Sequence, residues 1–254
     1  MPRSISIYLG CLSLFCIFSL FLFNLTATAA KEKVIYEAEE ITDINELYER
    51  ARNGISDEPI KNQNLPNWEL TEKETEIRMN KHMSEIEEYA TNQLLSVKKV
   101  GDVEVKEYAA TVFADIDLKE HSFEENDSFV SILGSTNRSK WDDSVSVRAY
   151  STIYFTESTY RGMDYVRLDK VTGGWQRSDT SVSLSNRKVV LGCSGTPVGS
   201  QTTTRNPTTN SFSYTTPSTW KRVTAVQSIV GVNTTVTLKR GTSSQWTLKL
   251  TNNY

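Results

Sequence analysis

The chain has 254 residues, of which 38% are hydrophobic and 23% charged, and its formal net charge at pH 7 is −3. This length allows one or two domains, and the slightly acidic balance argues against a nucleic-acid partner. Two of the three cysteines, Cys11 and Cys16, lie in an N-terminal apolar segment, which leaves Cys193 alone in the rest of the chain. The class of small disulfide-stapled proteins is therefore excluded.

Residues 1–30 have the three-part pattern of a secretory signal peptide. Arg3 precedes an apolar run over residues 5–25, and the small-residue sequence Ala27-Thr28-Ala29-Ala30 follows it. This pattern predicts cleavage near Ala29 and a secreted, extracellular protein. The apolar run is also long enough to span a bilayer as a helix, so an uncleaved N-terminal membrane anchor is the alternative.

Charge is unevenly distributed over the remaining chain. Residues 31–93 contain 16 Asp and Glu against 8 Lys and Arg, which leaves −8. Residues 144–254 contain 13 Lys and Arg against 4 Asp and Glu, which leaves +9. This division predicts either that the acidic N-terminal helices dock on the basic region, or that the basic region has an anionic partner of its own.

The acidic region, residues 31–93, carries two helix signals separated by a linker at 56–68. The first is Asp43 followed by Glu46, with apolar residues at helical spacing and Gly54 beyond the last turn. The second is the capping box Thr71 and Glu74. Apolar residues then recur at spacings of three and four, which predicts a helix; they are Met79, Met83, Ile86, Ala90 and Leu94.

From residue 94 to 254 the apolar period changes to two, which predicts short β-strands. Gly101-Asp102 is a hairpin turn between two strands, and residues 144–156 alternate most regularly. Gly173-Gly174 and Ser185-Asn186 are predicted to be turns, and residues 194–219 a long loop with one short strand at 212–214. Eight to ten strands without intervening helices predict an antiparallel β-sandwich domain, with a partly closed β-barrel as the alternative.

Two stretches carry a resemblance to known proteins. GGWQRSDTSVSLSNRKVVLGCSG, residues 173–195, and EVKEYAATVFADI, residues 104–116, resemble a group of small exported proteins of Gram-positive bacteria that have no assigned function. The similarity covers residues 90–254. It implies export and a β-domain, and it supplies no catalytic residue.

No catalytic, cofactor or metal site is predicted. Cys193 would need a base to act as a nucleophile, and the only histidines, His82 and His121, lie in the predicted acidic helix and an acidic loop. Cys193 also shares the strand parity of Val189 and Leu191, as a core cysteine would. The chain has too few His and Cys for a zinc site, and its acidic stretch at 115–127 lacks the register of a calcium loop.

Binding is the function that the residues favour. Exposed aromatic rings stack on sugars, and neighbouring cations attract anionic polymers or lipid headgroups. The predicted ligand surface consists of Trp175, Arg177, Arg187, Lys188, Trp220, Lys221 and Arg222. We therefore expect a non-catalytic exported protein that binds an anionic cell-envelope polymer, glycan or membrane surface. The alternatives are an extracellular hydrolase that uses carboxylates or Cys193, and a secreted toxin-like competition factor.

Overall fold

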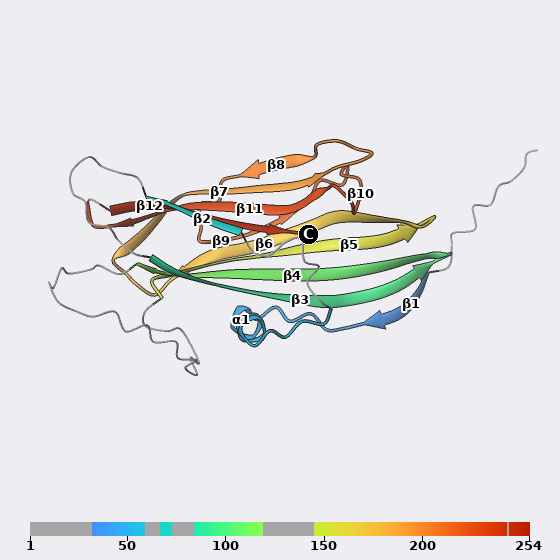
Figure 1. Ribbon diagram of the computed structural model, residues 1–254, viewed down its shortest axis with the longest axis horizontal. Helices are drawn as coiled ribbons and strands as arrows, with labels where there is room; N and C mark the ends of the chain where they lie inside the picture. The colour runs from blue at the N-terminus through green and yellow to red at the C-terminus, as the bar shows by residue number, and fades with distance from the viewer. Residues whose placement is uncertain (1–31, 59–66, 73–83, 119–144, 243) are drawn as a thin grey trace, which may run out of the picture. The chain divides into compact units, whose positions relative to one another are not determined.

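The computed structural model describes residues 32–58, 67–72, 84–118, 145–242 and 244–254 as two antiparallel β-sheets stacked face to face (Figure 1). The predicted β-sandwich is confirmed, and the closed-barrel alternative is wrong. Sheet A has the strand order β1-β3-β4-β5-β6-β10, with β9 also paired to β6, and sheet B has the order β2-β12-β11-β7-β8. Sheet A contains β1 (Glu32–Glu37), β3 (Ser84–Val100), β4 (Val103–Leu118), β5 (Val147–Tyr160), β6 (Met163–Arg177), β9 (Ser211–Thr215) and β10 (Val223–Thr224). Sheet B contains β2 (Asn67–Glu72), β7 (Val182–Ser194), β8 (Thr202–Arg205), β11 (Ile229–Arg240) and β12 (Ser244–Asn253), and the one helix described is α1 (Ile44–Arg52).

The main core lies between the two sheets. Alternate residues of each strand point inward, because successive side chains in a β-strand project to opposite faces. Sheet A contributes fully buried residues such as Ile116, Ile153 and Trp175, and sheet B contributes residues such as Leu191 and Leu248. The hairpin predicted at Gly101-Asp102 joins β3 to β4, and Gly101 adopts the positive φ of 63° that this tight turn requires.

The first predicted helix is confirmed as α1. The side chain of Asp43 caps it by accepting hydrogen bonds from the backbone N–H groups of Asn45 at 2.8 Å and Glu46 at 3.1 Å. Within the described ranges, no helix combines the length and apolarity needed to cross a membrane. The predicted signal peptide or anchor lies outside the described residues, so secretion stays a prediction.

Helix α1 packs on the outer face of sheet A and forms a second, smaller core there. Its buried residues Leu47, Tyr48 and Ala51 contact Phe113 of β4. The Tyr48 ring meets the Phe113 ring edge-on, with centroids 5.3 Å apart. The contact is therefore largely apolar and aromatic, and docking driven by the charge difference between the two regions stays a prediction.

The second predicted helix is wrong wherever its residues are described. Thr71 lies in β2, and residues 84–94 lie in β3, so position 94 falls inside a strand. Residues 73–83, which include Glu74, Met79 and Met83, lie outside the described residues. The apolar residues Ile86, Ala90 and Leu94 recur every four positions, and a spacing of four also keeps residues on one face of a strand. These three side chains pack against the main core from β3.

Two predicted turns are also wrong, because both fall inside long strands. Gly173 and Gly174 lie within β6, where neighbouring atoms leave no room for a side chain at either position. A Cβ on Gly173 would come within 2.6 Å of the Phe212 ring, and one on Gly174 within 2.5 Å of the Asn210 carbonyl oxygen. Asn186 lies within β7 at a positive φ of 48°, where the register with β11 shifts.

After α1, the chain turns around the edge of sheet A. The Asp57 backbone N–H donates to the Asn92 carbonyl of β3 at 2.9 Å, and the Asp57 carboxylate accepts from the Leu94 backbone N–H at 3.1 Å. These hydrogen bonds are made to the part of β3 that does not pair with β1. They bring Glu58 to the inner side of sheet A, while β2, which comes later in the chain, belongs to sheet B.

Candidate functional site

A groove with a volume of about 660 Å³ lies on the outer face of sheet A. We call it the basic groove. It is bordered by strands β3, β4, β5 and β6 and by the segment that leads into β10. Its lining residues are Val100, Val103, Val105, Glu107, Thr156, Ser158, Arg167, Trp220, Lys221 and Arg222.

Strand alternation explains why the strand residues of the groove face the same way. Val105 pairs with Ser158, and Arg167 pairs with Thr156, across neighbouring strands. On β4, Val105 has the same parity as Phe113, which faces α1, so the groove lies on the face that α1 covers further along the sheet.

The cations of the groove are positioned by the segment that precedes β10. The Gln201 side chain accepts a hydrogen bond from the Lys221 backbone N–H at 2.8 Å and donates one to the Lys221 carbonyl at 2.8 Å. Two residues later, Val223 is fully buried and pairs with Val166 of β6. With both ends fixed in this way, the exposed side chains of Lys221 and Arg222 are held at the border of the groove.

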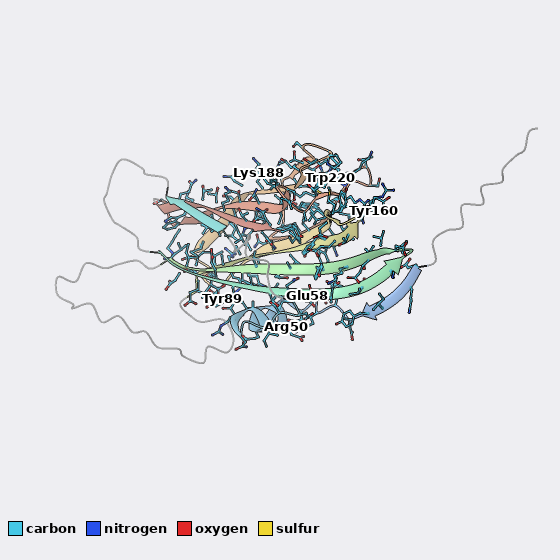
Figure 2. The ribbon with its side chains drawn as sticks, turned by 45° about the vertical axis from the view of Figure 1, so that its right-hand side comes forward. Arg50, Glu58, Tyr89, Tyr160, Lys188 and Trp220 are labelled. Carbon is cyan, nitrogen blue, oxygen red and sulfur yellow. The ribbon has the colours of Figure 1, made fainter. Side chains whose placement is uncertain are left out.

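Arg222 is held by aromatic rings. Its guanidinium carbon lies 4.4 Å from the centroid of the Tyr165 ring and 5.8 Å from that of Tyr160, and one N–H donates to the Ser158 hydroxyl at 3.2 Å. A cation above an aromatic ring at an exposed site gains about 0.5–1 kcal/mol. Figure 2 shows Trp220 and Tyr160 toward the same end of the sandwich.

The acids near the groove already have cationic partners. Asp169 accepts from Arg167 at 2.6 Å, and Glu107 lies 3.4 Å from the Lys98 ammonium group. Among the described residues, no carboxylate lies within ion-pair distance of Lys221. The groove therefore has a positive balance, and an anion would find a cation available at Lys221.

The structure divides the two tryptophans of the predicted ligand surface. Trp175 is 1% exposed and packs in the main core against Phe212, with ring centroids 5.6 Å apart. Its expected position at the surface is wrong, because the predicted turn beside it is the interior of β6. Trp220 is half-buried and lines the basic groove, together with Lys221 and Arg222.

The remaining predicted residues do not line the groove. Arg177 lies at the other end of β6, where its side chain donates to the Val182 carbonyl at 2.7 Å. Arg187 donates to the Asn210 side chain at 3.0 Å, and Lys188 is exposed on β7 of sheet B. The seven predicted residues therefore do not form one surface.

Three residues outside the predicted ligand surface contribute to this region: Tyr160, Tyr165 and Arg167. Arg167 lies between Val166 and Leu168, which are both fully buried. The alternation of that strand was sufficient to place Arg167 on the outer face. The hairpin that brings Tyr160 opposite Met163 and near Tyr165 depends on strand pairing, which the local sequence does not specify.

Cys193 is confirmed as a core residue. It is fully buried, its thiol lies 3.7 Å from the Lys221 carbonyl oxygen, and burial raises its pKa. A raised thiol pKa disfavours the thiolate that a nucleophile requires. His82 and His121 lie outside the described residues. In the described part of the chain, no three His, Cys, Asp or Glu side chains gather in an arrangement suited to a metal ion.

The chain matches no family model, no curated protein and no solved structure. Its resemblance to exported proteins of Gram-positive bacteria therefore stays a prediction.

Proposed function

We propose that this protein is a non-catalytic binding protein that takes an anionic ligand in the basic groove. The observation that carries the proposal is the juxtaposition of Lys221 with the ring-supported guanidinium of Arg222 at the border of an open cavity. The groove volume of about 660 Å³ falls within the range of roughly 300–1,000 Å³ that is usual for ligand sites.

The ligand class follows from the groove lining. Lys221, Arg222 and Arg167 present N–H donors to phosphate or carboxylate oxygens. Trp220 adds a flat apolar surface on which a sugar ring or another apolar ligand group can stack. These features fit an anionic envelope polymer in which charged groups alternate with sugar or polyol units, and such a ligand agrees with the predicted export of the chain.

The test is a binding titration at low salt with three probes: sodium polyphosphate, polygalacturonate and neutral dextran. We expect the two anionic polymers to bind and dextran to bind much more weakly. Affinity should fall as salt is added, because exposed charges are screened within about 10 Å at 0.1 M ionic strength. In the double variant Lys221→Gln, Arg222→Gln, affinity should fall about tenfold or more, as expected for loss of charge-assisted contacts.

The matched control is the double variant Lys188→Gln, Arg205→Gln. It removes the same charge from exposed positions on β7 and β8 of sheet B, away from the groove. We expect this variant to bind as the unmodified protein does. Equal weakening in both double variants would mean that net charge alone drives binding, and the proposed site would then be rejected.

A further inference from the structure

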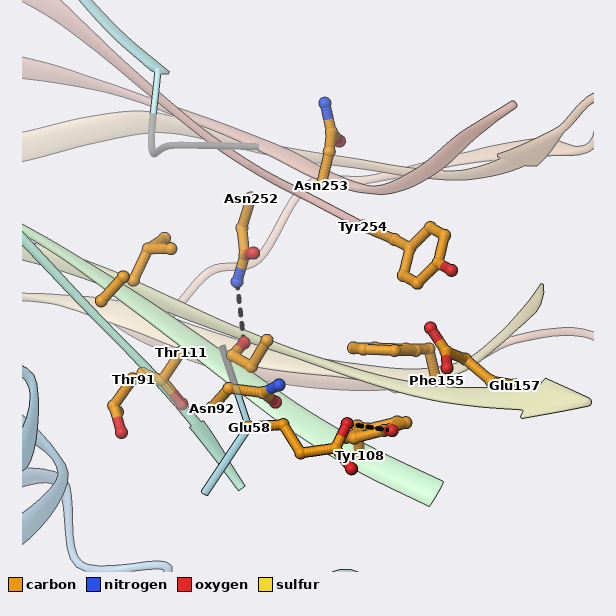
Figure 3. A pocket seen from close by; sticks show the side chains of 13 residues that line it. Glu58, Thr91, Asn92, Tyr108, Thr111, Phe155, Glu157, Asn252, Asn253 and Tyr254 are labelled. Atoms are coloured by element: carbon orange, nitrogen blue, oxygen red, sulfur yellow. Dashed lines mark hydrogen bonds between the residues drawn. The ribbon is translucent and has the colours of Figure 1, made fainter. Parts of the chain in front are cut away.

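A second cavity lies between the two sheets, at the edge where the chain turns around β3 (Figure 3). We call it the inter-sheet pocket. Sheet A contributes Asn92, Tyr108, Phe155 and Glu157, and the end of the chain at sheet B contributes Tyr254. Glu58 completes the wall from the segment after α1. The cavity volume is about 50 Å³, which holds roughly three to five water molecules.

Aromatic rings form one wall of the pocket. The Tyr108 and Phe155 rings are stacked, with centroids 5.1 Å apart and an angle of 18° between their planes. Tyr254 meets Phe155 edge-on, also with centroids 5.1 Å apart. The negative face of an aromatic ring favours a cation over an anion.

Asn92 supplies an acceptor that the protein leaves unused. The residue is 8% exposed, and its side-chain oxygen Oδ1 is buried without a hydrogen-bond partner. Figure 3 shows the Asn92 side chain beside Glu58 and Tyr108 at the pocket. A buried carbonyl oxygen without a partner costs about 1–3 kcal/mol, so the site favours a molecule that brings an N–H or O–H donor.

Two carboxylates, Glu58 and Glu157, line the same cavity, and Lys106, which lies opposite Glu157 on the neighbouring strand, offsets one of their two negative charges. The Tyr108 hydroxyl donates to Glu58 at 2.6 Å, and the Lys106 ammonium group lies 3.3 Å from the other oxygen of that carboxylate. Burial, the hydrogen bond to Glu58 and the charge of Glu157 together raise the pKa of Tyr108. The phenol therefore stays neutral and keeps its proton directed at Glu58.

Two side-chain donors at the pocket already have acceptors. Besides the Tyr108 hydroxyl, the Asn252 amide donates to the carbonyl groups of Ala110 at 3.0 Å and Ser151 at 2.8 Å, across the gap between the sheets. An anion would thus meet the carboxylates of Glu58 and Glu157. A cation with several N–H groups would meet acceptors.

We propose that the inter-sheet pocket binds a primary ammonium group carried on a short aliphatic chain. Its N–H donors would bond to Asn92 Oδ1 and to the carboxylates of Glu58 and Glu157, and its carbon would contact the Phe155 and Tyr254 rings. A quaternary ammonium group has no N–H donor for these acceptors, so it should not bind in this way. This site is separate from the basic groove, differs from it in the sign of the ligand charge, and does not depend on the function proposed for the groove.

The test is a titration of the purified full-length protein with methylammonium chloride, followed by NMR chemical shifts and by the unfolding temperature. We expect saturable shifts for nuclei of residues 90–92 and 155–157 and a higher unfolding temperature. Methanol, which has a similar size and no charge, should bind at least tenfold more weakly. Potassium and tetramethylammonium ions should produce neither effect. If potassium reproduces both effects, the pocket binds cations without regard to their N–H groups, and the proposal is overturned. If methylammonium produces neither effect, the pocket holds only water, and the proposal is likewise overturned.

Two variants locate the site. Glu157→Gln and Asn92→Ala should each weaken methylammonium binding about tenfold, because each removes an acceptor from the ammonium group. The matched control is Glu104→Gln, which removes the same charge from a β4 residue outside the pocket. Circular dichroism verifies that each variant is folded. If Asn92→Ala does not fold, the comparison uses Glu157→Gln alone. Unchanged binding in the folded variants would refute the assignment.

Discussion

Arg148 and Asp115 form a buried, bidentate ion pair on the outer face of sheet A. The guanidinium Nε lies 2.6 Å from one carboxylate oxygen and Nη2 lies 2.9 Å from the other, and the two side chains are 3% and 2% exposed. The Tyr48 hydroxyl of α1 donates a hydrogen bond to Asp115 at 2.6 Å, and the centroid of the Tyr48 ring lies 3.4 Å from the Arg148 guanidinium carbon. The helix therefore covers this pair and completes its hydrogen bonding.

The first prediction concerns this pair. Asp115→Asn should lower the free energy of unfolding by about 3–5 kcal/mol, because it leaves the Arg148 charge buried without its counterion. The double variant Asp115→Leu, Arg148→Met should lose much less. Urea unfolding followed by circular dichroism measures both. As a control, Glu49→Gln disrupts an ion pair with Arg52 in which only the glutamate is exposed, and it should cost less than about 1 kcal/mol. If Asp115→Asn is as stable as Glu49→Gln, the buried pair is dispensable for stability.

The second prediction concerns the glycine pair of β6. Gly173→Ala should destabilise the protein by about 1–3 kcal/mol, because the new Cβ would lie 2.5 Å from the Tyr150 carbonyl oxygen. Gly192→Ala is the matched control on β7, since its Cβ would meet Thr202 at an ordinary 3.5 Å. Thermal unfolding of the two variants compares them. Equal loss in both would indicate a general cost of alanine in these strands and no specific clash.

The third prediction concerns stability at high pH. Burial and the hydrogen bond to Glu40 raise the pKa of Tyr154 to about 12, and burial and the bond to Glu87 raise that of Tyr89 to about 12. Both phenols lose their protons near pH 10 in the unfolded chain. The unfolded state therefore binds fewer protons than the folded state between pH 10 and 12, and stability falls as the pH rises through that window.

Urea unfolding at pH 9 and at pH 11 measures this loss. The variants Tyr154→Phe and Tyr89→Phe should each reduce it, because a phenylalanine has no proton to lose. Tyr160→Phe is the control, since Tyr160 is 40% exposed. If the fall in stability is the same in all three variants and in the unmodified protein, other groups cause it.

The fourth prediction concerns Cys193. Iodoacetamide should leave this thiol unmodified in the folded protein, because the side chain is fully buried and burial raises its pKa. Peptide mass spectrometry before and after denaturation in urea measures the modification of Cys193 separately from that of Cys11 and Cys16. Rapid modification of the native protein would contradict the core assignment and would reopen the question of thiol chemistry.

The sequence predicts the strands best where one face is apolar and the other polar. The β5 region shows this, because Val147, Ala149 and Ile153 point into the core while Arg148 and Tyr150 point outward. It predicts α1 equally well, because the Asp43 cap and the apolar face are local signals. Strand β5 and helix α1 are thus determined by residues that are close together in sequence.

The first part of β3, residues 84–94, was missed because its inward face is interrupted by polar residues. Glu88 and Asn92 alternate there with Ile86, Ala90 and Leu94, so the period of two is concealed. Burial raises the pKa of Glu88 and leaves Asn92 Oδ1 without a partner. A local pattern could not anticipate these costs, because they arise from the sheet packing. The same interruption supplies one wall of the inter-sheet pocket.

The basic groove was only partly predictable for a related reason. Lys221, Arg222 and Trp220 are adjacent in sequence, so composition was sufficient to select them. The Tyr165 ring beneath Arg222 and the Ser158 hydroxyl beside it come from other strands, and only the pairing of β5, β6 and β10 brings them together. Trp175 was misplaced because a pair of glycines is a turn signal in most sequences and here permits close packing.

The pairing of β2 with β12 joins residues near the two ends of the described chain, with Trp246 opposite Glu72. Among the described strands, β2 has a single sheet neighbour, β12, which lies far from it in sequence. Sheet B is therefore closed at this edge by segments far apart in sequence, and contacts between such distant segments slow folding because a long loop must close first.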